Sequence, residues 1–377
     1  TATGRGGNAI RIENSSNTSL YYNDGHSGTS IGINIFEVIQ NTYLLHNTAT
    51  SNSSNGLAIQ GTNKTNVQNN TAIAHTGTSS ALAVINVTNG SFTNNFAVSA
   101  ARGFSVDDSE NNTFTNNTGW GDTSFGWRAI GNSDGNRFLH NKAHSNDSNA
   151  FILSPGRDNY IENLTATSNA TSGVAAIVIQ NGRNNTLIRS FGAGTAGRGI
   201  SFDNSTNSSF INVSAVSHSS LALTVEGNSF LNYIANSTGE SNVSGSRGVY
   251  SLDSHDNTYE NIVANGLIDT VAFELANSPN NTFTNVTAQA ITQQAGYIGT
   301  TSSGNTFIRG QFGTRDSAAM HLDSGPNNVF RNVSFFASVG HAPVAVFDNS
   351  DNNAFFNSTL GTNGKWIALD VGVTGTT

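Results

Sequence analysis

The chain has 377 residues, no cysteine, 11% charged residues and a net charge of −8. The absence of cysteine excludes disulfides and thiolate metal sites, and 16 Lys and Arg against 24 Asp and Glu leave no basic surface for nucleic acid. No apolar run reaches membrane-spanning length and no charged-then-apolar leader opens the chain, so we expect a secreted or surface-exposed protein without a membrane-spanning segment.

A sequence motif recurs about every 24 residues along the whole chain. It contains alternating apolar residues, a polar turn, Asn, one residue, an aromatic residue, and then Asn with a small residue. Clear copies span 104–119, 273–288 and 320–335. A solenoid buries its core coil by coil and can lengthen without dividing into domains. We therefore expect one domain over 1–377, with repeats from about 7 to 373.

Each repeat opens with a predicted strand, as at 9–12, 82–85, 222–225 and 345–347. Apolar residues alternate there with period two, which is typical of a strand with one buried face. No stretch keeps a helical period, and helical repeats need more residues than this period supplies. The pattern predicts an all-β fold, a parallel β-helix of about 15 coils of about 24 residues.

The aromatic residue that follows the turn is expected to point into the core in every coil. The predicted inward column is Leu20, Tyr43, Asn66, Phe92, Phe114, Phe138, Tyr160, Leu187, Phe210, Phe230, Tyr259, Phe283, Phe307, Phe330 and Phe355.

Asparagine forms two further columns around these aromatic positions. Two places before them stand Asn41, Asn112, Asn136, Asn185, Asn228, Asn257, Asn281, Asn305, Asn328 and Asn353, and two places after them stand Asn94, Asn116, Asn212, Asn232, Asn261, Asn285, Asn332 and Asn357. Because stacked coils lie about 4.8 Å apart, an asparagine can bond to its equivalent in the next coil. We interpret both columns as structural ladders; the alternative is a ligand-binding amide stripe.

This pattern resembles the right-handed parallel β-helix superfamily of pectate lyases, polygalacturonases and phage tailspikes. The repeat motif is most similar to the NosD-like repeats of secreted and archaeal cell-surface proteins. The resemblance covers about 7–373 and implies a single-stranded right-handed β-helix. It does not select a function, because the superfamily contains hydrolases, lyases, epimerases, adhesins and structural proteins.

Carboxylates follow the first strand of several coils. Asp107 and Asp108 are similar to the paired acids of polygalacturonases, but the other motifs of that family are absent. Three successive coils carry Asp203, Glu226 and Asp253, and another three carry Asp323, Asp348 and Asp370. Stacked carboxylates could share a Ca²⁺ ion; the alternative is that each Asp forms a turn by bonding to nearby backbone. No other cofactor is expected.

The segment 250–256 is similar to the Y-x-x-D-P-H-D motif of mannuronan C5-epimerases, with Ser254 in place of the proline. In that family Tyr, Asp and His manage the removal and return of a sugar proton. The resemblance implies Tyr250, Asp253 and His255 as the catalytic residues of an alternative, enzymatic function.

N-x-[ST] sequons are frequent and suggest N-linked glycans on a secreted protein. The candidate sites are Asn63, Asn111, Asn116, Asn163, Asn184, Asn212, Asn280, Asn285, Asn332 and Asn357.

The coils leave no room for the long loops that build a substrate cleft in β-helix enzymes. The leading hypothesis is therefore an extracellular structural protein, a glycosylated β-helical rod that assembles with itself, end to end or laterally, into a filament, sheath or surface layer. The predicted assembly ends are Ile10, Ile12, Trp366, Ile367 and Leu369. The alternatives are a polysaccharide-modifying enzyme of the uronate epimerase or lyase type and a glycan-binding adhesin.

Overall fold

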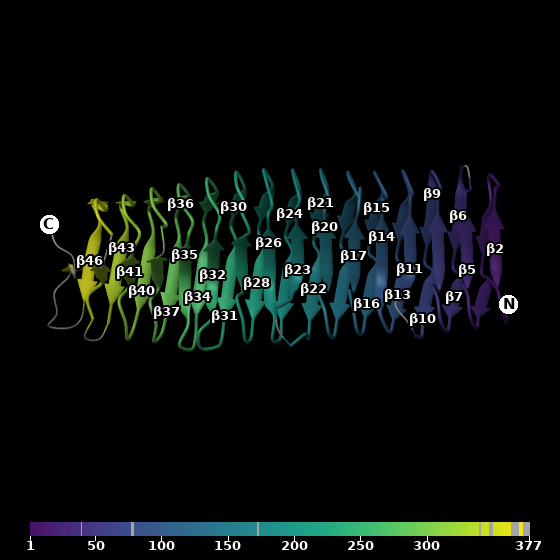
Figure 1. Cartoon of the computed structure of the whole chain (residues 1–377), viewed down its shortest axis with the longest axis horizontal. Helices are drawn as coiled ribbons and strands as arrows, with labels where there is room; N and C mark the ends of the chain where they lie inside the picture. The colour runs from purple at the N-terminus through teal and green to yellow at the C-terminus, as the bar shows by residue number, and fades with distance from the viewer. Residues whose placement is uncertain are drawn as a thin grey trace. The chain divides into compact units, whose positions relative to one another are not determined.

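The computed structural model describes residues 1–38, 40–76, 79–171, 173–299, 301–338, 341–346, 350–362 and 369–371. These residues form short strands joined by tight bends, and none of them forms a helix. Each coil adds one strand to each of three parallel sheets, A, B and C, and the coils make a β-solenoid of about 15 turns with roughly 24 residues per turn. The predicted all-β solenoid is confirmed (Figure 1).

The chain forms two compact units, residues 1–191 and 192–377. In the first unit, sheet A contains β1 (Ala2–Gly4), β4 (Asp24–Ser27), β7 (Thr48–Ser51), β10 (Thr71–Ala74), β13 (Phe96–Ser99), β16 (Thr118–Gly121), β19 (Lys142–Ser145) and β22 (Thr165–Ser168). Sheet B contains β2 (Ile10–Glu13), β5 (Ile33–Phe36), β8 (Leu57–Gln60), β11 (Ser80–Ile85), β14 (Arg102–Asp107), β17 (Trp127–Ile130), β20 (Phe151–Ser154) and β23 (Ala175–Gln180). Sheet C contains β3 (Ser19–Tyr21), β6 (Thr42–Leu45), β9 (Thr65–Gln68), β12 (Ser91–Thr93), β15 (Thr113–Thr115), β18 (Arg137–Leu139), β21 (Tyr160–Glu162) and β24 (Thr186–Ile188).

The second unit repeats this order. Its sheet A contains β25 (Phe191–Gly194, which begins on the last residue of the first unit), β28 (Ser214–Ser217), β31 (Thr238–Ser241), β34 (Val263–Gly266), β37 (Thr287–Ala290), β40 (Gln311–Thr314), β43 (Ser334–Ala337) and β46 (Thr359–Thr362). Sheet B contains β26 (Arg198–Asp203), β29 (Leu223–Glu226), β32 (Arg247–Leu252), β35 (Val271–Ala276), β38 (Gly296–Gly299), β41 (Met320–Asp323), β44 (Val344–Val346) and β47 (Leu369–Val371). Sheet C contains β27 (Ser209–Ile211), β30 (Tyr233–Ala235), β33 (Thr258–Glu260), β36 (Thr282–Thr284), β39 (Thr306–Ile308), β42 (Val329–Arg331) and β45 (Ala354–Phe356).

Aromatic rings stack in register inside both units. In the first unit Phe114 lies between Phe92 and Phe138, with ring centroids 4.7 and 5.1 Å apart. In the second unit Phe283 lies in the same way between Tyr259 and Phe307, each 4.6 Å away. These side chains are fully buried, as the repeat predicts. Because each ring packs against its equivalents, the column contributes both apolar burial and ring stacking in every coil.

Four positions of the predicted column are wrong. The inward positions belong to Leu44, Val67, Ile161 and Ile234, in place of Tyr43, Asn66, Tyr160 and Phe230. Tyr43, Asn66 and Tyr160 each stand one residue before the buried aliphatic residue, and adjacent side chains of a strand point to opposite faces. Phe230 instead forms an isolated bridge with His255 at the corner between sheets B and C.

Buried asparagines at the corner before sheet C account for the register at Ile161 and Ile234, whereas the same corner carries Thr42 and Thr65 before Leu44 and Val67. The side-chain oxygen of Asn281 accepts a hydrogen bond from the backbone N–H of Asn257 at 2.9 Å, and Asn305 does the same for Asn281 at 2.8 Å. The buried ladder contains Asn112, Asn136, Asn159 and Asn185 in the first unit, and Asn232, Asn257, Asn281, Asn305 and Asn328 in the second, where it continues to the half-buried Asn353. The predicted first column is correct except at Asn41 and Asn228, which lie outside it and have left-handed backbones.

Asn232 of the second predicted column is buried and belongs to the ladder just described, whereas the other seven positions of that column do not form a buried ladder. Asn94, Asn116, Asn212, Asn261, Asn285, Asn332 and Asn357 have φ between 48° and 56°, the left-handed region that asparagine tolerates at tight corners. Some of their side chains still bond from coil to coil, as Asn285 does to Asn261 at 2.8 Å. The buried ladder of this corner stands one residue later and occurs in the first unit, at Asn47, Asn70, Asn95, Asn117 and Asn141.

Candidate functional site

The outer face of sheet B in the second unit gathers most of that unit's half-buried ionisable groups. Two of its strands begin with Arg-Gly, at Arg198-Gly199 and Arg247-Gly248. A Cβ on Gly248 would lie 2.7 Å from two backbone oxygens of neighbouring strands. Only glycine fits so close to the next coil, and it places the preceding arginine at the start of the strand. We call the residues Arg198, Glu226, Arg247, Tyr250, Glu274, Tyr297, His321 and Asp323 the sheet B face.

An ion pair between Arg247 and Glu274 lies at the centre of this face. The Nε atom of Arg247 is 2.5 Å from Oε2 of Glu274, whose side chain is almost fully buried. The Arg247 guanidinium also lies 5.7 Å from the centre of the Tyr250 ring. Burial, followed by the charge of Glu274, raises the pKa of Tyr250. Arg247 therefore already forms an ion pair with a carboxylate of its own chain.

A second ion pair has the same design two strands earlier in sheet B. Arg198 pairs with Glu226 of the next coil, and the hydroxyl of Ser201 donates to the same carboxylate oxygen of Glu226 at 2.8 Å. Both ion pairs are partly buried and connect neighbouring coils. They therefore link the coils as well as placing charged groups on the surface.

Tyr297, His321 and Asp323 form the third group of this face. The Tyr297 hydroxyl donates to Oδ2 of Asp323 at 2.8 Å, and its ring meets the His321 ring edge-on at 5.1 Å. Burial and the bond to Asp323 raise the pKa of Tyr297 to about 12. Burial lowers the pKa of His321, and the charge of Asp323 opposes this in part. At neutral pH the group therefore offers a neutral imidazole beside a phenol, which can act as base and acid.

The three residues of the epimerase-like motif make different contacts. Tyr250 lies on the sheet B face, whereas Asp253 stands at the exposed corner after β32, with a φ of 50°, and accepts a bond from the Asn277 amide at 3.0 Å. His255 pairs with Asp256 at 2.8 Å and stacks on Phe230. The charge of Asp253 acts weakly on Tyr250. The three residues of the motif therefore lie at different places: Tyr250 on β32, Asp253 at the corner after it, and His255 at the isolated bridge with Phe230.

Sequence reasoning missed Arg247, Glu274, Tyr297 and His321 as members of one face. Tyr250, Glu274, Tyr297 and His321 are consecutive register partners in sheet B. Their spacing equals the repeat, so a search of the outward positions at that period would have found them.

The predicted calcium ligands do not share one position of the coil. Asp203 and Glu226 are register partners, but Ser251 pairs with Val225, so Leu252 follows Glu226 in the column and Asp253 falls one residue later. Among the residues of known placement, no three His, Asp or Glu side chains form a group that could hold a metal ion. Of the second carboxylate set, Asp348 lies outside the described residues.

The candidate glycosylation sites occupy corners of the coil. Asn111, Asn116, Asn184, Asn212, Asn280, Asn285, Asn332 and Asn357 are exposed, and Asn63 and Asn163 are half-exposed. All except Asn63 have a left-handed backbone. Their side chains are open to solvent, which attachment of a glycan requires.

The predicted assembly ends are described only in part. Ile10 and Ile12 lie in β2 and are half-exposed, whereas their register partners Ile33 and Ile35 are fully buried. Leu369 belongs to β47, and Trp366 and Ile367 lie outside the described residues. None of the described residues forms a helix of the length and apolar character that a membrane crossing needs.

No protein-family model matches the chain, and no curated protein sequence matches it. Among solved structures it is similar to the A-module of the mannuronan C-5 epimerase AlgE6 from Azotobacter vinelandii, with 10% identity, 86% of this chain and 92% of the other covered, and a TM-score of 0.32. For the periplasmic alginate epimerase AlgG the values are 11%, 90%, 78% and 0.33. For the surface protein and adhesin PfbA of Streptococcus pneumoniae they are 11%, 91%, 91% and 0.27. Similarity at this level carries no argument about function.

Proposed function

We propose that the protein is an extracellular structural solenoid, N-glycosylated on its corners, that associates with copies of itself. The observation that carries this proposal is the use of its polar groups. Buried amides and even exposed asparagines bond to equivalent positions in the next coil, and the half-buried ion pairs join residues of neighbouring coils. Such groups stabilise a long regular scaffold and leave little free chemistry for a substrate.

The regular coils support the same proposal. In sheet C the inward partners are 22 to 26 residues apart, from Phe92 and Phe114 at one limit to Ile161 and Leu187 at the other. Enzymes usually bind substrates in deep clefts, and coils of such constant length provide little chain for cleft walls.

Self-association is the part of this proposal that a solution experiment can test directly. In the proposed assembly a coil of a second copy would cover the half-exposed Ile10 and Ile12. We expect concentration-dependent assembly of the parent protein in light scattering and electron micrographs. The variant Ile12→Asp should assemble markedly less, while Arg11→Ser on the exposed face of the same strand should assemble like the parent. A monodisperse monomer at high concentration would contradict the proposal.

A second candidate function is the modification of an acidic polysaccharide on the sheet B face. The observation that favours it is the pairing of a neutral imidazole, His321, with the phenol of Tyr297, since removal and return of a proton need a base and an acid. Its test is incubation with polyuronates, followed by NMR for epimerised residues and absorbance for unsaturated lyase products.

The variants separate this candidate from the epimerase-like motif. If the sheet B face is catalytic, His321→Ala and Tyr297→Phe abolish the activity and His255→Ala leaves it unchanged. Loss of activity in His255→Ala alone would instead place the chemistry at the motif. If the parent protein modifies no polyuronate, the scaffold proposal stands alone.

A further inference from the structure

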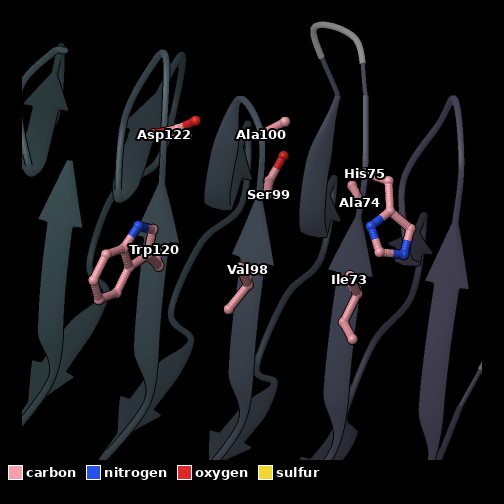
Figure 2. A pocket seen from close by; sticks show the side chains of 8 residues that line it. All are labelled: Ile73, Ala74, His75, Val98, Ser99, Ala100, Trp120 and Asp122. Atoms are coloured by element: carbon pink, nitrogen blue, oxygen red, sulfur yellow. The ribbon is translucent and has the colours of Figure 1, made fainter. Parts of the chain in front are cut away.

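A hollow of about 320 Å³ opens on the outer face of sheet A in the first unit. Figure 2 shows its residues on neighbouring strands: Ile73 on β10, Val98 on β13 and Trp120 on β16, with His75 and Asp122 at the turns above. The register confirms that Val98 lies between Ile73 and Trp120. Trp120 therefore borders the hollow at one end, and the shorter side chains of Ile73 and Val98 line the rest of the strand surface.

Trp120 lines one end of this hollow, and Figure 2 shows its indole extending from β16 on the side away from Val98. The side chain is 42% exposed, which is unusual for the largest apolar residue of a regular coil. On the side away from the hollow the ring of His144 covers it, with centroids 4.1 Å apart. His144 is itself held by Thr167 at 2.7 Å and by Asn146 at 3.0 Å. The indole is thus supported on one side and accessible on the other.

The rim of the hollow supplies polar groups of a particular kind. The carboxylate of Asp122 is held by the Asn146 amide at 2.7 Å, and its backbone N–H donates to Ser99 at 3.1 Å. The exposed imidazole of His75 stands on the opposite side of Val98. The lining contains no Lys or Arg. A carboxylate and an imidazole recognise hydroxyl groups, and the absence of a cation disfavours an acidic ligand.

We propose that this hollow binds the ring of a neutral hexopyranoside from an extracellular glycan, stacked on Trp120. A pyranose with equatorial hydroxyls has an apolar C–H face, which suits the indole, and a hydroxyl edge, which reaches Asp122 and His75. Small-molecule sites of this size are mostly apolar with a few placed polar groups. This site is separate from the sheet B face, and it does not depend on self-association.

The test uses protein made in bacteria, without N-linked glycans, and cellotetraose as the probe. Tryptophan fluorescence should change saturably, because Trp120 is exposed whereas Trp127 is fully buried. We expect Trp120→Ala to weaken binding at least about tenfold, and Asp122→Asn several-fold. Phe96→Ala is the matched control, since Phe96 is an exposed aromatic on β13 that does not line the hollow. Circular dichroism checks folding, and Trp120→Phe serves if the alanine variant misfolds.

Three other outcomes would overturn the proposal. The first is the absence of any response to cellotetraose, or an equal response in Trp120→Ala. The second is tighter binding of tetragalacturonate or tetramethylammonium, which would make the ligand acidic or cationic. The third outcome concerns the glycosylated protein. If Trp120 fluorescence changes when the protein's own glycans are removed enzymatically, and does not change when cellotetraose is added, the hollow is occupied by a glycan of the protein itself.

Discussion

At the scale of single residues, small side chains make room for large ones. Trp127 is fully buried in the first unit and stacks on Phe104 with ring centroids 3.9 Å apart. A Cβ on Gly119 would lie 2.5 Å from the Trp127 indole, so only glycine fits opposite it. The indole N–H donates to the Lys142 carbonyl at 3.0 Å, which satisfies its one polar atom.

The Phe283→Ala variant tests the aromatic column. Phe283 is fully buried between two rings, so the truncation leaves a cavity inside a rigid stack. We expect a loss of about 3–5 kcal/mol in the stability of the second unit, measured as a lower urea midpoint. Thr282→Ser, on the half-exposed outward position beside it, should change little. An unchanged urea midpoint in Phe283→Ala would mean that the aromatic column does not stabilise the core.

The Tyr297 hydroxyl gives a prediction on pH. Its pKa is raised to about 12, so the folded state holds this proton more tightly than the unfolded chain does. The resulting stability is fully present below the ordinary tyrosine pKa near 10 and is lost as pH rises through about 12. The tyrosinate absorbance titration, taken as parent minus Tyr297→Phe, should show this late step. In Asp323→Asn it should move toward lower pH; an unmoved step would exclude the Asp323 bond as a cause.

At the scale of the structural element, the asparagine ladder sets the register of sheet C in the coils that contain it. Each amide uses its oxygen for the backbone of one neighbouring coil and its NH₂ group for carbonyls nearby, as Asn281 does with Asn257 and Ser254. A buried backbone group left without such a partner is costly. Placing another residue at the inward corner would break the bonds of two coils, so the ladder outweighs the preference of an adjacent aromatic residue for the core.

The ladder can be tested with Asn281→Ala. This change removes the acceptor of the Asn257 N–H at a fully buried corner, and we expect a loss of about 1–3 kcal/mol. Asn280→Asp, one residue earlier on the exposed corner, keeps a side chain that tolerates the left-handed backbone and should stay within about 0.5 kcal/mol of the parent. Urea unfolding of both variants provides the comparison. Equal stabilities would contradict a structural role of the ladder.

At the scale of the whole molecule, the same coil is repeated with local specialisation. The first unit has a second asparagine ladder and an exposed tryptophan above a hollow, whereas the second unit has Val or Ser at several of the equivalent corner positions and carries the ion pairs of the sheet B face. A solenoid tolerates such differences because each coil contacts mainly its neighbours.

Glycosylation is a prediction about the whole chain. Exposed corner asparagines such as Asn111, Asn184 and Asn280 should carry glycans in the protein from its natural source. The intact mass should therefore exceed the 39.4 kDa of the bare chain, and peptide mapping should place the excess on exposed sequons. An intact mass equal to that of the bare chain would remove glycosylation from the proposed function.

The amino-acid sequence by itself determined the solenoid, the coil length and most of the buried column, because a strict period and the alternation of apolar residues are local properties of the chain. Residues such as Phe114 and Phe283 could be assigned correctly for that reason. The tertiary structure alone decided the register at Tyr160 and Phe230, where the buried amides of Asn159 and Asn232 bond to neighbouring coils and move an aliphatic residue inward. It also decided that Tyr250 meets Arg247 and Glu274 on one face, and that Asp253 and His255 turn to other partners. These contacts depend on which coil positions pair across the sheets, and a register shift of one residue between coils changes every partner.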